Sequence, residues 1–231
     1  MRRFWKAADV VEADGGFGIA LDGRRVKTPA RADLHVPTQA LAKAIAAEWS
    51  EAGETVDPRA MPLTGLANAA IDRVAPDKDG FAAGLVRYAE SDLTCYRAEG
   101  PAALVARQAE SWDVLLAWAR RRYDVDFACV SGVMHVPQPQ ETVRKLGHAV
   151  ATLDAFRLAG LSPLVTIGGS LVAGLAVLEE MLPAGDAWEA VSLDDRWQLE
   201  QWGDDPEARV ALDARRRDFL VAARFLELLR A

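Results

Sequence analysis

The sequence predicts an α+β protein in which a small β-rich N-terminal domain precedes a larger all-helical C-terminal domain. Strand-like stretches and turn signals fill the first 36 residues. Beyond them, apolar residues recur at the three- and four-residue spacing of amphipathic helices. A chain of 231 residues can bury roughly 70% of its unfolded surface, so it needs neither a disulfide nor a metal ion to fold.

A β-hairpin is expected near the N-terminus. Residues 17–21 and 24–27 have the composition of strands, and Asp22-Gly23 between them tolerates the positive φ of a tight turn. A third strand is expected over residues 34–36. The glycines at 15–18 precede a strand instead of linking a strand to a helix, so they indicate a turn and not a phosphate-binding loop.

A helix is expected to follow, with Thr38 at its start and Gly53 placed to end it. Its apolar residues recur at helical spacing as far as Trp49. Glu48 lies at the edge of this apolar stripe, beside Trp49. These two residues are candidates for partner binding.

Two further helices are expected, over residues 62–74 and about 78–90. The polar stretch between them contains a proline and interrupts the helical pattern. We place the domain boundary there, which gives a β-rich N-terminal domain of residues 1–76, with one or two helices, and a helical domain of residues 77–231.

The C-terminal domain is expected to be almost wholly helical. A long helix begins at Pro101, and the chain breaks at 135–140, where prolines interrupt it. The last helix covers about 205–230, and Asp204 and Asp205 are placed to cap its first turn. The long helix carries one buried apolar stripe, made by Trp112, Leu115, Leu116 and Ala119.

Residues 158–178 carry no charge, and this length meets the criterion for a transmembrane helix. Pro163 and several glycines interrupt the stretch, and Glu179 and Glu180 follow it in place of anchoring lysines or aromatics. We therefore favour a buried hairpin of helices, with no stable membrane insertion.

Composition excludes several classes of partner. The net charge of −7 and the pI of about 5.1 oppose nucleic-acid binding, which needs clustered cations to neutralise phosphates. The N-terminus has neither the apolar core of a signal peptide nor the acid-poor composition of a transit peptide. We expect a cytoplasmic bacterial protein.

No catalytic, cofactor-binding or metal-binding residue is predicted. The three histidines lack a second ligand at metal spacing, and no serine lies in a nucleophile elbow. Cys95 and Cys129 form neither a zinc motif nor a nucleophile motif. The alternative is an enzyme with an unrecognised small-molecule site in the cleft between the domains.

Residues 192–205 instead indicate a recognition surface, because two tryptophans lie among carboxylates and amides. In a helix, Asp195, Gln198, Leu199 and Trp202 fall at positions i, i+3, i+4 and i+7 and therefore share one face. Tryptophan is favoured at interfaces, because it buries a large apolar area and retains a hydrogen-bond donor. The alternative is that these tryptophans pack in the core or between domains.

Sequence strings resemble, in order, the ATP12 family of F1-ATPase assembly chaperones over nearly the whole chain. The strings are RFWK at 3–6, LDGRRVKTPAR at 21–31, VPTQALAKAIAAEW at 36–49, MPLTGLANAAIDRV at 61–74, LTCYRAEGP at 93–101, WDVLLAWARRRY at 112–123, HVPQP at 135–139, GSLVAGLAV at 169–177 and LDDRWQLEQWGDD at 193–205. The ordered set is far more specific than any one string.

This resemblance implies a chaperone that binds the unassembled F1 α subunit, shields its β-facing surface and leaves during assembly of the α/β hexamer. It implies no enzyme activity and no bound nucleotide or metal. It also implies a role for C-terminal acidic residues and for a tryptophan. The predicted partner-binding residues are Asp194, Asp195, Gln198, Glu200, Trp202, Glu48 and Trp49.

Overall fold

The structure is a computed structural model that describes residues 2–203 and 205–230, except for the side chain of Trp202. It contains two compact units. The first unit comprises Met1–Lys78, Asp154–Gly160 and Arg224–Ala231, and the second comprises Asp79–Leu153 and Leu161–Ala223. The α+β class is confirmed, whereas the contiguous domains 1–76 and 77–231 stay a prediction.

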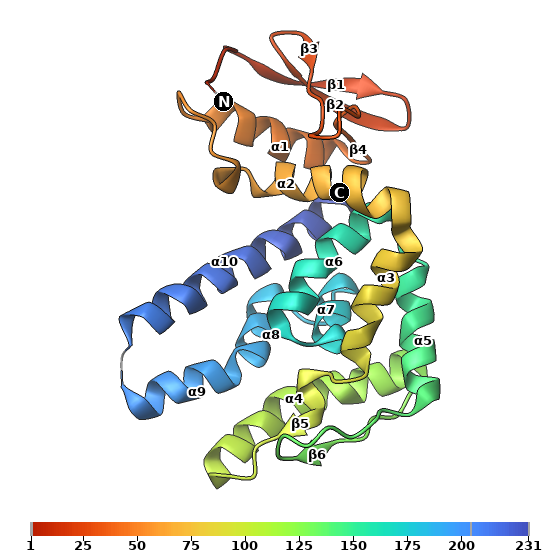
Figure 1. Ribbon diagram of the computed structural model, residues 1–231, viewed down its shortest axis with the longest axis vertical. Helices are drawn as coiled ribbons and strands as arrows, with labels where there is room; N and C mark the ends of the chain where they lie inside the picture. Colours follow the sequence, from red (N-terminus) through yellow and green to blue (C-terminus); the bar gives the residue numbers. More distant parts are fainter. Residues whose placement is uncertain (1, 204, 231) are drawn as a thin grey trace. The chain divides into compact units, whose positions relative to one another are not determined.

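The first unit contains an antiparallel sheet in which β2 is central (Figure 1). Its strands are β1 (Ala8–Ala13), β2 (Gly16–Leu21), β3 (Arg24–Arg25) and β4 (His35–Val36). Asp22 and Gly23 have φ angles of 47° and 81°, so the predicted turn between β2 and β3 is confirmed. No separate strand was predicted at β1, where charged residues interrupt the apolar pattern.

Helix α1 (Gln39–Glu51) packs against β1 and β2 in the first unit. Its predicted start is confirmed, because the Thr38 side chain accepts a hydrogen bond from the backbone N–H of Leu41. Helix α2 (Pro62–Ala69) follows and continues as a π-helical turn over Ala70–Val74. Short 3-10 turns lie on either side, over Pro58–Ala60 and Ala75–Asp77.

The second unit is mainly helical. The remaining helices of the chain are α3 (Lys78–Val86), α4 (Ala102–Tyr123), α5 (Gln140–Ala151), α6 (Ala155–Gly168), α7 (Leu171–Leu178), α8 (Ala184–Val191), α9 (Leu193–Trp202) and α10 (Pro206–Leu228). The predicted stripe of α4 is buried, and Trp112 Nε1 donates a hydrogen bond of 2.8 Å to the carbonyl of Ala190. This bond fixes α8 to α4.

The uncharged stretch 158–178 forms parts of two helices. Gly169, with a φ of 66°, separates α6 from α7, and the buried Ser170 caps α7 by accepting a hydrogen bond from Ala173 N–H. Within residues 2–203 and 205–230, no helix is both long and apolar enough to cross a membrane.

The break before α5 is wider than predicted, because residues 124–139 are all non-helical. Two short strands, β5 (Tyr96–Arg97) and β6 (Val130–Ser131), pair in parallel there. Gln138 holds the segment in place, since its amide both donates to and accepts from the backbone of Ala128. Such contacts between distant residues leave no periodic signal in the sequence.

Candidate partner-binding surface

The beginning of α9 is anchored to the core of the second unit. Ser192 and Leu193 are buried, and the Ser192 hydroxyl donates to the carbonyl of Trp188. The amide of the buried Gln108 donates a hydrogen bond of 2.7 Å to Asp194 Oδ1. The carboxylate of Asp194, one of the predicted partner-binding residues, therefore helps to position α9.

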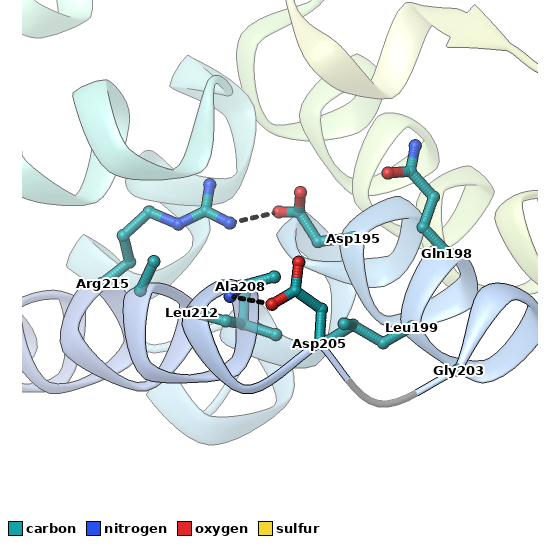
Figure 2. Close-up of a pocket in the computed structure, with 9 residues that line it drawn as sticks. Asp195, Gln198, Leu199, Gly203, Asp205, Ala208, Leu212 and Arg215 are labelled. Atoms are coloured by element: carbon teal, nitrogen blue, oxygen red, sulfur yellow. Dashed lines mark hydrogen bonds and ion pairs between the residues drawn. The ribbon is translucent and has the colours of Figure 1, made fainter.

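Beyond this anchor, a groove lies between the helices α9 and α10 (Figure 2). Its volume is about 410 Å³. The groove is lined by Asp195, Gln198, Leu199, Gly203, Asp205, Ala208, Ala211, Leu212 and Arg215. Asp195, Gln198 and Leu199 are thus brought together as their helical spacing predicts, while the side chain of Trp202 lies outside the described residues.

Helix α10 supplies the opposite wall, which the sequence reasoning missed. Ala208, Ala211, Leu212 and Arg215 occupy positions i, i+3, i+4 and i+7 and so share one face of α10. The spacing puts these residues on one face of α10, but it does not show that this face lies opposite α9. The two alanines have small side chains, which leave room between the helices.

The groove has an apolar floor and charged groups at its edges. Figure 2 shows Leu199 and Leu212 directed into the space between the helices, and Leu212 is only 8% exposed. Asp195 Oδ2 and Arg215 Nη2 are 2.6 Å apart, and each of these side chains is 45% exposed. The exposed Gln198 extends away from α10, so its amide is open to a partner.

Asp205 combines a structural contact with a position in the groove. Its Oδ1 accepts hydrogen bonds from the backbone N–H groups of Glu207 at 2.9 Å and Ala208 at 3.3 Å. This confirms that Asp205 caps α10. The same role predicted for Asp204 falls outside the described residues.

Glu200 is occupied by a contact with α4. Arg107 Nη1 lies 2.7 Å from Glu200 Oε2, and the Arg107 guanidinium lies 4.7 Å from the ring centroid of Trp197. The side chains of Arg107 and Glu200 are exposed, and that of Trp197 is half-buried. None of these three residues lines the groove. Arg107 was missed by the sequence reasoning, because its partners lie almost a hundred residues away.

Glu48 and Trp49 belong to the first unit, where both make internal contacts. The Glu48 carboxylate accepts hydrogen bonds of 2.8 Å from the backbone N–H groups of Leu63 and Thr64, and a third from the Thr64 hydroxyl. It therefore caps the start of α2. Trp49 is buried against Trp5, with ring centroids 5.2 Å apart.

Replacing Glu48 with alanine is expected to lower the free energy of unfolding by about 1–2 kcal/mol, because the first turn of α2 loses its cap. Chemical denaturation of the full chain measures the change. Glu51→Ala is the control, because Glu51 is exposed at the end of α1. An unchanged stability of Glu48→Ala would show that the cap contributes nothing.

The part of the chain that the structure describes contains no group of three or more histidine, cysteine or acidic residues arranged to hold a metal ion. The groove instead combines an apolar floor, two carboxylates, a guanidinium and an amide. Groups of these kinds contact apolar and basic side chains at protein interfaces.

Comparison with known proteins identifies the family. Residues 2–120 match a family described as ATP12 chaperone protein. The fold is similar to a crystal structure of Atp12 from Paracoccus denitrificans, with a TM-score of 0.94 and 42% identity over 99% of this chain and 98% of that one. An aspartate-to-lysine mutant of P. denitrificans Atp12p gives the same TM-score and identity, over 99% and 97% of the two chains.

A more distant relative is Protein atp12, mitochondrial, from Schizosaccharomyces pombe. It is 27% identical over 214 residues, which cover 87% of this chain and 74% of the relative. The family match spans more than half of the chain, and the P. denitrificans similarity spans nearly all of it. The chain therefore belongs to the ATP12 family of chaperones for F1-ATPase assembly.

Proposed function

We propose that this chain binds the unassembled α subunit of F1-ATPase, shields the surface that will contact the β subunit, and is displaced as the α/β hexamer forms. It acts by binding and not by catalysis, without a cofactor, in the bacterial cytoplasm. The α subunit is the partner implied by the sequence resemblance. The family description supports the chaperone role.

The α9–α10 groove is the observation that carries this proposal. A chaperone that must later be displaced has to bury enough apolar area to bind its client. Its affinity must still be low enough for the client to dissociate. The groove offers a small apolar floor, made by Leu199 and Leu212, between charged edges. Carboxylates at Asp195 and Asp205 attract arginines or lysines of the client, which favours the correct partner and faster association.

The contacts described above divide the predicted partner-binding residues into two groups. We propose direct contact with the α subunit for Asp195 and Gln198, which line the groove, and for Trp202, which shares their helical face. We propose an indirect role for the residues that hold the fold or the position of α9: Asp194, Glu200, Glu48 and Trp49.

Co-expression with the α and β subunits of the same F1-ATPase, each separately, tests the choice of partner. Size exclusion with light scattering is expected to show a stoichiometric complex with α and none with β. A complex with β alone would overturn the proposal. A failure to bind either subunit would also overturn it, and would favour the alternative of an enzyme with a small-molecule site.

A further inference from the structure

The two cysteines of the chain, which are far apart in sequence, meet in the second unit. In the parallel pair β5–β6, Tyr96 lies opposite Val130, and Cys95 and Cys129 immediately precede these residues. Continuing this register back by one residue places Cys95 beside Cys129. Neighbouring strands lie about 4.8 Å apart, which falls within the Cα separation that a disulfide spans.

The two thiols differ in their access to solvent. Cys129 is exposed, whereas Cys95 is completely buried. Burial raises the pKa of the Cys95 thiol, and the nearby Asp92 carboxylate raises it further. A reagent in solution therefore meets Cys129 first, and Cys95 can react only with a mixed disulfide already formed at Cys129.

We propose that Cys95 and Cys129 are a site of reversible oxidation that forms an intramolecular disulfide by exchange with a small-molecule disulfide such as oxidised glutathione. The Cys129 thiolate attacks one sulfur of that oxidant, forms a mixed disulfide and expels one thiolate. The Cys95 sulfur then attacks Cys129 Sγ and breaks the mixed disulfide, and the proton of Cys95 passes to the departing thiolate, which leaves as the second small-molecule thiol. Two protein thiols are oxidised, and one external disulfide is reduced to two thiols.

A disulfide between Cys95 and Cys129 would stabilise the β5–β6 pair. A two-residue strand pair is marginal by itself, and residues 124–139 contain no helix. The bond would join this segment covalently to the turn Leu93–Cys95, which precedes β5. It would also close a loop containing α4, and such closure restricts the unfolded chain. Oxidation is therefore expected to raise the melting temperature.

The test uses the full-length protein, incubated with oxidised glutathione or with reduced glutathione, then alkylated with iodoacetamide and weighed by mass spectrometry. After oxidation we expect a monomer with no alkyl group and no bound glutathione. After reduction, unfolding before alkylation should allow two alkyl groups to be added. The oxidised protein should melt at a higher temperature than the reduced one.

The Cys129→Ser variant is the matched control, because the exposed position tolerates serine. It should form no intramolecular disulfide and should show no difference in melting temperature between the two incubations. A wild-type product that retains glutathione on Cys129, links two chains, or stays fully reduced would overturn the proposal. The outcome is independent of α-subunit binding, because neither thiol lines the α9–α10 groove.

Discussion

Replacing Asp195 with lysine is expected to weaken binding of the F1 α subunit by about 10- to 100-fold, which corresponds to about 1.4–2.8 kcal/mol. The substitution removes a carboxylate from the groove edge and places a second cation beside Arg215. A basic client surface would then meet like charges. The fold should remain intact, because the Asp195–Arg215 pair is half exposed and such pairs contribute about 0–1 kcal/mol.

Isothermal titration of the isolated α subunit measures this effect, and thermal melting checks the fold of the variant. Asp213→Lys is the matched control. This variant changes the net charge by the same amount as Asp195→Lys, but at a position on α10. Asp213 is exposed and does not line the groove. Equal affinities of Asp195→Lys and the wild type would exclude this groove edge from the interface. Equal losses in both lysine variants would instead indicate a general effect of net charge.

Replacing Asp92 with alanine is expected to lower the free energy of unfolding by about 2–4 kcal/mol, because it leaves several buried donors without an acceptor. Asp92 is completely buried. One carboxylate oxygen accepts from the backbone N–H and the hydroxyl of Thr94, at 3.0 and 2.7 Å. The other accepts from the backbone N–H of Val172 at 3.0 Å, in the first turn of α7.

Burial raises the pKa of Asp92, while the hydrogen bonds from Val172, Ser170 and Thr94 oppose this shift. The carboxylate also lies at the positive end of the α7 dipole, which favours its charged form. Urea denaturation measures the loss of stability. Asp126→Ala is the control, because that side chain is 90% exposed, and a change below about 0.5 kcal/mol is expected. An equally small change in Asp92→Ala would show that the buried donors find other acceptors.

Local signals accounted for the elements that the sequence identified. Asp22-Gly23 specified the turn between β2 and β3, because few residue pairs tolerate two positive φ angles. Thr38 marked the start of α1, because its hydroxyl reaches a backbone N–H within the same turn. The spacing from Asp195 to Leu199 likewise placed one wall of the groove. In each case the residues that interact are close together in sequence.

The sequence by itself therefore determined the fold class, the main helices, the family resemblance and the α9 face. Only the tertiary structure showed that α10 supplies the second wall of the groove, that Glu48 caps α2 and that Cys95 lies beside Cys129. The physical reason is the distance along the sequence between the residues that interact. Periodicity and capping act over three or four residues, whereas these contacts join segments that only packing brings together.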